Sequence, residues 1–269
     1  MAARPRRMVA VVAAVATLAA AGAAAVSPAA PSGRQASTSR HVAVPILLYH
    51  HISGAPAGAT HPRLWVSPGR FRRQLATLAQ AGYRAVTIAD VWRAWHGTGT
   101  LPDKPIVLSF DDGYPSQYRH AARIMRAYGW PGVLFLQVGR LDDARGLGRG
   151  QVEQMIADGW ELGAHTRTHP NLTTLDATRL QDEVAGSREA LRRDFGVAVD
   201  AFAYPNGRVD ATVESAVRTA GFTAATTTQP RVASPGDDVY RLPRILVAGT
   251  RTPAGLLRLL RIRAATLQP

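Results

Sequence analysis

Short apolar runs alternate with amphipathic stretches along residues 41–269. Each apolar run is bounded by Gly, Pro or polar residues and is too short for a helix, so these runs predict strands. Strands that alternate with helical stretches are typical of an α/β protein with a parallel sheet. The predicted strands are Val44–Tyr49, Ala85–Ile88, Pro105–Phe110, Gly132–Val138, Trp160–Ala164, Val199–Tyr204 and Phe222–Thr227.

Helix signals stand between the predicted strands. Ser67 and Pro68 supply an N-cap and a first-turn proline for a helix that ends near Gly82. The clearest helix is predicted for Ala177–Phe195, where apolar or small residues recur at helical spacing and Gly196 follows. The recurring residues are Leu180, Val184, Ser187 and Leu191.

About seven such β/α units predict a barrel or a distorted barrel. An open doubly wound sheet would give a similar linear pattern. No internal repeat occurs, and neither the P-loop nor the dinucleotide-binding glycine signature is present. The sequence therefore predicts the α/β class and leaves these two architectures open.

The N-terminal part of the sequence has the pattern of a segment that directs export. Arg4, Arg6 and Arg7 precede an uncharged apolar run from Met8 to Val26, which is typical of a signal peptide. The run also approaches the roughly 20 residues that cross a bilayer, so an uncleaved membrane anchor is the alternative. We predict a signal or anchor at 1–26, a linker at 27–40, a working domain at 41–269, and an extracellular or cell-envelope location.

The composition narrows the chemistry. With 46% hydrophobic and 19% charged residues, the chain is neither disordered nor collagen-like. It has no cysteine, so any metal must bind His, Asp or Glu. The formal charge of +13 comes from scattered arginines, and we expect no nucleic-acid partner. Leucines and arginines from Leu256 to Arg263 predict a basic amphipathic helix, which either packs on the barrel or contacts an anionic wall or lipid surface.

Two adjacent carboxylates follow the predicted strand Pro105–Phe110. Asp111 and Asp112 precede Gly113, at the end of a strand where parallel α/β folds place their sites. One acid can ligate a metal while its neighbour accepts a proton from water. An Asp-Gly turn with solvated acids is the alternative interpretation of these residues alone.

Two histidines follow the predicted strand Trp160–Ala164. His165 and His169 are four residues apart, and Pro170 indicates that the turn between them is brief. They can converge on one ion with an Asp from the first pair, which leaves positions for water as in an open catalytic metal site. Surface or core histidines would also explain this pair taken alone.

These segments resemble the polysaccharide deacetylases of carbohydrate esterase family 4, which share the NodB homology domain. The family's Thr/Ser-Phe-Asp-Asp-Gly motif stands here as Ser109–Gly113, and its His-Ser/Thr-x-x-His motif stands as His165–His169. The resemblance extends from about Val44 to the C-terminal region. It implies a distorted (β/α) barrel, Asp111 as the general base, and Asp112, His165 and His169 as ligands of a divalent metal. Zinc is our expectation, although two histidines and one carboxylate also suit other first-row ions.

The third family motif, Arg-x-Pro-Tyr-Gly, is only partly present, in Phe202–Gly207. Ala203 stands where the family has the arginine that orients the base, and the sequence leaves Arg208, Arg241 and Arg244 as open replacements. Asn206 stands where the family has an aromatic wall. The resemblance implies that Tyr204, Pro205 and Asn206 contact substrate.

The family's general acid is a histidine near the C-terminus, but no histidine follows His169. The segment Ile46–Ile52 resembles the opening of the exported poly-β-1,6-N-acetylglucosamine deacetylases, where the N-terminal strand supplies this function. Closing a barrel brings the first and last strands together, so we expect His50 to be the acid. A packed core imidazole is the alternative for His50, and His51 is either structural or in contact with substrate.

Two aromatic residues in predicted loops, Trp65 and Tyr114, are candidates for an exposed platform that stacks on sugar rings. By analogy with the family, the Tyr114 backbone N–H would steady an oxyanion. The predicted function is metal-dependent removal of N-acetyl groups from a β-linked N-acetylglucosamine polysaccharide, with the 1,6-linked polymer favoured. A deacetylase of peptidoglycan, chitin or acetylated xylan, or a non-catalytic glycan-binding relative, is the alternative.

Overall fold

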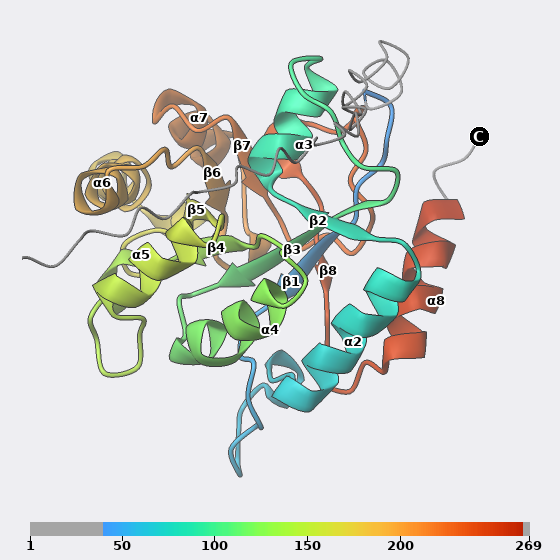
Figure 1. Cartoon of the computed structure of the whole chain (residues 1–269). Coiled ribbons are helices and arrows are strands. Elements are labelled where there is room, and N and C mark those ends of the chain that lie inside the picture. The colour runs from blue at the N-terminus through green and yellow to red at the C-terminus, as the bar shows by residue number, and fades with distance from the viewer. Residues whose placement is uncertain (1–39, 266–269) are drawn as a thin grey trace, which may run out of the picture. The chain divides into compact units, whose positions relative to one another are not determined.

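The computed structural model describes residues 40–265, in which parallel strands alternate with helices (Figure 1). The strands are β1 Ile46–Tyr49, β2 Arg84–Val86, β3 Pro105–Asp111, β4 Val133–Leu136, β5 Glu161–Ala164, β6 Ala201–Ala203, β7 Ala224–Thr226 and β8 Ile245–Leu246. The α-helices are α2 Pro68–Gln80, α3 Ile88–Trp95, α4 Arg123–Arg126, α5 Arg149–Ala157, α6 Ala177–Phe195, α7 Ala211–Thr219 and α8 Pro253–Ala265. Shorter helical turns are η1 Pro62–Leu64, the π-helical η2 Gln117–Ala122, η3 Val138–Arg140, η4 Leu172–Thr174, η5 Pro205–Gly207 and η6 Val239–Arg241.

The predicted signal or anchor at 1–26, and the predicted linker at 27–40 apart from Arg40, lie outside the described residues. Both therefore stay predictions. Within residues 40–265, none of the helices has the length and apolar character that crossing a bilayer requires.

The strands form one curled sheet in the order β7-β6-β5-β4-β3-β1-β8, with β2 paired to the first half of β3. The order from β3 to β7 runs consecutively, as in a barrel, whereas a doubly wound sheet would reverse direction. A bridge between Thr226 and Leu242 links β7 to the segment that leads into β8. The predicted distorted barrel is confirmed, and the open doubly wound alternative is wrong.

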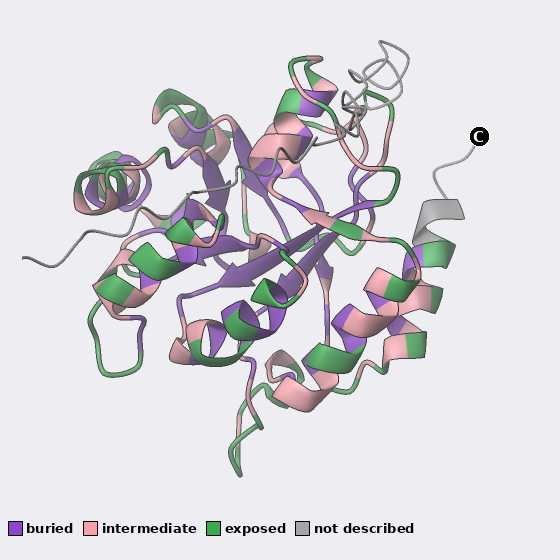
Figure 2. Ribbon diagram, in the orientation of Figure 1, coloured by how far each residue is buried: buried purple, intermediate pink, exposed green. Residues whose placement is uncertain are grey.

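The core explains why the strands read as continuous apolar runs. Alternate residues point to opposite faces of the sheet, and both faces are covered. On β4, Leu134 and Leu136 pack into the large cluster beneath the helices, whereas Val133 and Phe135 pack into a smaller cluster on the other face. Figure 2 shows the strands buried and the helices exposed on one side only. The smaller cluster combines these strand residues with Ile88 and Val91 of α3, so α3 covers part of this face of the sheet.

Local sequence signals place the helices. The Ser67 hydroxyl accepts a hydrogen bond from the Arg70 backbone N–H at 3.3 Å, and Pro68 opens α2 as predicted. The predicted helix Ala177–Phe195 is confirmed residue for residue as α6, and Gly196 ends it with a φ of 67°. The predicted basic helix near the C-terminus is α8, which packs against α2.

Several predicted strands extend beyond the observed strands, and one observed strand was not predicted. Ala85–Ile88 was wrong at its end, because Thr87 caps α3 with a capping box to Asp90 and Ile88 is already helical. Most other strands are shorter than predicted by one or more residues, where the chain turns into the loops, whereas β3 extends one residue beyond the predicted Pro105–Phe110 to Asp111. The missed strand β8 pairs with β1 through Leu47–Ile245 and Leu48–Leu246, which confirms that the first and last strands meet.

Candidate active site

The two carboxylates at the end of β3 lie in different positions, Asp111 on the inward face of the strand and Asp112 at the turn that follows it. Ser109 and Asp111 follow Val107 on the face of β3 that points into the barrel, and Asp111 is only 3% exposed. Asp112 then takes a φ of 76° and Gly113 a φ of 80°, which turns the chain sharply. A Cβ at residue 113 would lie 2.3 Å from the Leu136 side chain, so glycine is required there for space as well as for backbone conformation.

Arg244 forms a buried ion pair with Asp111. Its two terminal nitrogens each donate to a different Asp111 carboxylate oxygen, both at 2.7 Å, and its Nε donates to the Thr227 carbonyl at 3.0 Å. The arginine side chain is fully buried and lies over the Phe135 ring. Burial alone would raise the pKa of Asp111, but the Arg244 guanidinium outweighs burial and holds this pKa at about 2. The Asp111 carboxylate is therefore ionised at neutral pH.

This pair resolves the question raised by Ala203. Among the three arginines left open by the sequence, Arg244 contacts Asp111, whereas Arg241 pairs with Glu214 and Arg208 is exposed at the cleft described below. Arg244 reaches the barrel interior because its segment bridges the gap between β7 and β1.

Asp112, His165 and His169 form a cluster with the geometry of a metal site. One ligand atom from each lies within 4.8 Å of the other two. The Asp112 Oδ1 atom is 3.7 Å from the Nε2 atoms of both histidines. Asp112 and His165 are buried, and His169 is partly exposed toward solvent.

Neighbouring groups orient both histidines. The His165 Nδ1 atom lies 2.7 Å from the Ala203 carbonyl, which is an acceptor only, so Nδ1 carries the proton and Nε2 is left as the ligand atom. Burial lowers the pKa of His165, which favours the neutral imidazole that metals bind. The His169 backbone N–H donates to the Thr166 hydroxyl at 2.9 Å, and both residues have φ near 65°.

Glu183 of α6 holds the loop between these histidines. Its buried carboxylate accepts hydrogen bonds from the backbone N–H groups of Arg167 and Thr168, at 2.8 and 2.9 Å, and from the Thr168 hydroxyl. β-Branched residues rarely adopt a positive φ, so a loop containing Thr166 in that conformation needs such anchors. Glu183 was not predicted from the sequence, although its place three residues after Leu180 puts it on the apolar side of the predicted helix.

His50 and His51 point to different surroundings. His50 lines the same cleft as the metal cluster, and its Nδ1 atom is buried with no hydrogen-bond partner among the described residues. Burial lowers the pKa of His50, while Asp111 and Asp112 oppose this effect. Gln117 ties the two strand ends together, because its amide nitrogen donates to the His50 and Asp111 carbonyl oxygens. The structure therefore brings His50 to Asp111 and Asp112, as the predicted acid requires.

His51 instead lies inside a stack of rings. Trp65 lies on one face, with centroids 4.1 Å apart, and Tyr114 on the other at 3.5 Å, with Arg140 over the Tyr114 ring. Burial lowers the pKa of His51 to about 4, so it is neutral at pH 7. The geometry favours the structural role for His51. It also covers one face of both Trp65 and Tyr114, so the predicted open aromatic platform is wrong in that respect.

A cleft of about 620 Å³ joins these groups. Of the three residues predicted to contact substrate, Tyr204 and Asn206 line this cleft, whereas Pro205 is buried and is not among the lining residues. The residues lining the cleft are Leu48, His50, His61, Arg63, Leu64, Asp111, Asp112, His165, His169, Tyr204, Asn206, Arg208, Thr228, Pro230 and Leu246.

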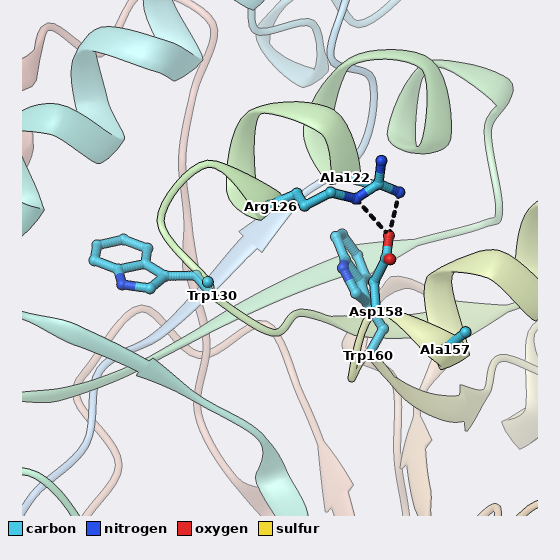
Figure 3. Close-up of a pocket in the computed structure, with 7 residues that line it drawn as sticks. Ala122, Arg126, Trp130, Ala157, Asp158 and Trp160 are labelled. Atoms are coloured by element: carbon cyan, nitrogen blue, oxygen red, sulfur yellow. Dashed lines mark hydrogen bonds and ion pairs between the residues drawn. The ribbon is translucent and has the colours of Figure 1, made fainter. Parts of the chain in front are cut away.

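A smaller cavity of about 200 Å³ lies elsewhere, between α4 and the end of α5 (Figure 3). Arg126 forms an ion pair with Asp158 beside the Trp160 ring, whereas the Trp130 ring points away from this pair. Its acid is paired with the arginine, and the cavity contains neither a histidine nor a hydroxyl nucleophile. The 620 Å³ cleft is therefore the candidate active site.

The donor set of the cleft fits a divalent metal. Asp112, His165 and His169 supply one oxygen and two nitrogens, and the cleft leaves room for further ligands. Three protein ligands with open positions are the arrangement of catalytic rather than structural sites. Zinc and other first-row ions accept this set.

Known proteins resemble this chain in sequence and in structure. A profile of the polysaccharide deacetylase family matches residues 98–225. YxkH of Bacillus subtilis, which is named a polysaccharide deacetylase, is 26% identical over 211 residues, covering 78% of this chain and 74% of that protein. A poly-β-1,6-N-acetyl-D-glucosamine N-deacetylase of Staphylococcus aureus is 21% identical over 197 residues, 68% of each protein.

Comparison with solved structures also identifies a deacetylase that is similar to this chain. The Streptococcus pyogenes deacetylase PplD, solved in complex with acetate, matches with a TM-score of 0.77 and 26% identity, over 82% of this chain and 99% of that one. This structural match covers more of the chain than residues 98–225, because it includes 82% of the residues. Residues 98–225 therefore match the polysaccharide deacetylase family, and the chain is similar to such deacetylases in sequence and in fold.

Proposed function

We propose that this chain uses a divalent metal to remove N-acetyl groups from a β-1,6-linked N-acetylglucosamine polymer outside the membrane. The observation that carries the proposal is the convergence of three groups on one cleft: the Asp112–His165–His169 cluster, the Asp111–Arg244 pair and His50. The choice of polymer is supported by the relative from Staphylococcus aureus. The location is supported by the N-terminal sequence alone.

Each group has a role in the proposed hydrolysis. A divalent ion held by Asp112, His165 and His169 would supply Lewis-acid polarisation of the acetyl carbonyl. Asp111, kept ionised by Arg244, takes a proton from the attacking water. His50 donates a proton to the departing amine, and the products are acetate and a glucosamine unit. The Tyr114 backbone N–H, which has no acceptor among the described residues, is free to donate to the developing oxyanion.

The positions of Arg244 and His50 argue against the alternative function, a non-catalytic glycan-binding protein. It rested on Ala203 in place of an arginine and on the lack of a C-terminal histidine. Arg244 now supplies the charge beside Asp111, and His50 supplies an imidazole at the cleft.

Acetate release from β-1,6-linked N-acetylglucosamine oligomers tests the proposal. The full chain is assayed after chelation and again after zinc is added back, with β-1,4-linked oligomers and acetylated xylan in parallel. We expect zinc-dependent release from the 1,6-linked oligomers. Release from the 1,4-linked oligomers or the xylan alone would move the substrate to chitin, peptidoglycan or xylan.

A matched pair of variants separates chemistry from folding. Asp111→Asn removes the proposed base while keeping the shape of the side chain, and Asp90→Asn makes the same change at the capping box of α3. We expect Asp111→Asn to lose acetate release and Asp90→Asn to retain it. Equal activity of the Asp111→Asn variant and the wild-type protein would exclude the proposed base.

A further inference from the structure

Acidic residues are unevenly distributed along this chain. Residues 1–89, 113–141 and 239–269 contain no Asp or Glu, although they contain many arginines. All 19 acidic residues therefore lie in the remaining segments. The proposed active site accounts for Asp111 and Asp112 but gives no reason for this separation of charge.

The fold brings parts of the three acid-free segments together. They supply α2, the η2–α4 segment and α8, respectively. α2 contacts both α8 and η2, and Figure 1 shows α4, α2 and α8 beside one another. Each helix buries its apolar side in the same core cluster, through residues such as Leu75, Met125 and Leu260.

The outer sides of these helices carry exposed arginines, which together we name the basic helix face. None of these arginines forms an ion pair with a carboxylate in the described part of the chain. The nearby Arg126 is excluded, because it pairs with Asp158. The basic helix face consists of Arg72 and Arg73 on α2, Arg119 and Arg123 on η2–α4, and Arg258 and Arg261 on α8.

An exposed apolar side chain lies within this face. Ile262 is 56% exposed and is the one exposed large hydrophobic residue among those described. It stands four residues after Arg258 on α8, so the two side chains are neighbours on the helix surface. A soluble polyanion would pair with the arginines but leave Ile262 in water. A bilayer with anionic headgroups would accommodate both, as it does for interfacial amphipathic helices.

We propose that the basic helix face docks on the surface of a lipid bilayer containing anionic lipids, with Ile262 entering the headgroup region. Six exposed arginines that form no ion pair among the described residues give this face a positive potential, which attracts such a surface within a Debye length. This inference does not depend on the proposed deacetylation, because it concerns helices outside the cleft.

Vesicle binding by the full chain tests this docking. Phosphatidylcholine vesicles are compared with vesicles in which part of that lipid is replaced by phosphatidylglycerol. The N-terminal apolar run can bind vesicles by itself, so the readout is the change between variants. An arginine near an anionic surface contributes about 1 kcal/mol, so Arg258→Gln/Arg261→Gln should weaken binding to the anionic vesicles on the order of 30-fold.

Matched variants make each outcome decisive. Arg179→Gln/Arg192→Gln removes the same charge from exposed positions of α6 and should leave binding nearly unchanged. Ile262→Ser should weaken binding to anionic vesicles but not to soluble polyphosphate. The proposal is overturned if the two arginine pairs weaken binding equally, or if phosphatidylglycerol has no effect. It is also overturned in favour of a polyanion if Ile262→Ser changes nothing while Arg258→Gln/Arg261→Gln abolishes polyphosphate binding.

Discussion

Replacing Arg244 is the most direct test of how the cleft keeps its base ionised. The guanidinium holds the pKa of Asp111 at about 2, against an ordinary value of 3.8, although burial acts in the opposite direction. This lowering of the pKa by roughly 2 pH units corresponds to roughly 2–3 kcal/mol, at about 1.36 kcal/mol per pH unit. Because burial remains when the guanidinium is removed, the pKa of Asp111 in Arg244→Gln should rise above 3.8.

The expected result is a displaced pH profile. If Asp111 must be ionised to accept a proton, the acidic limb of kcat/KM for acetate release should move upward by about 2 pH units in Arg244→Gln. Arg244→Lys keeps a positive charge but loses the two-pronged geometry, so its limb should lie between the two. Arg241→Gln is the matched control, since Arg241 pairs with Glu214 and not with Asp111. An unchanged acidic limb in Arg244→Gln would refute this reasoning.

The same variant carries a stability cost. Breaking a buried ion pair leaves an uncompensated charge and typically costs about 3–5 kcal/mol. Because the folded-state pKa of Asp111 is depressed, the contribution of this pair is fully present above pH 3.8 and is lost as pH falls toward 2. Thermal unfolding of wild-type protein and Arg244→Lys measures this loss even if Arg244→Gln folds poorly.

Three further predictions concern single side chains. Glu183→Gln weakens the carboxylate that holds the histidine loop, so zinc affinity measured by calorimetry should fall about tenfold or more; an unchanged affinity would show that the loop does not need this anchor. His50→Asn should lower kcat/KM by about 10²–10⁴-fold. Because burial lowers the pKa of His50, the alkaline limb of the wild-type kcat/KM profile should lie below pH 6.5. If this limb persists in His50→Asn, it belongs to another group. Glu161→Gln should raise the melting temperature at pH 8 but not at pH 5. Burial raises the pKa of Glu161 to about 7, whereas the unfolded chain ionises it near 4.5, so stability falls as pH rises between these values; equal effects at both pH values would contradict this sign.

The metal cluster could be predicted from sequence because its signals are local. Asp112 directly follows an apolar strand, and His165 directly follows another, with His169 four residues later. In a parallel sheet the carboxyl ends of neighbouring strands lie together, so adjacency along the chain translates into adjacency in space. The strand order β3-β4-β5 then brings the two segments to one edge.

The arginine beside the base could not be chosen in the same way. Arg244 and Asp111 are 133 residues apart, and their contact depends on which segment bridges β7 and β1. The two-residue strand β8 is too short to show an alternation of apolar and polar residues. The sequence therefore does not indicate which side chains of that segment face the barrel interior. The usable signal was chemical, since Arg244 is a lone charge in the apolar run from Leu242 to Val247.

The interior of the barrel explains how Ala203 can stand where the family has an arginine. Ala203 is buried among the small inward-facing residues, and it still orients His165 through its backbone carbonyl, which no side-chain substitution removes. The charge beside Asp111 needs only some inward-facing position close enough to reach the carboxylate. Arg244 meets this requirement from the opposite end of the sheet, held by the Thr227 carbonyl and the Phe135 ring. In a narrow barrel, the arginine that pairs with the base therefore needs only to reach the Asp111 carboxylate. It can do so from a segment outside the sequence motif.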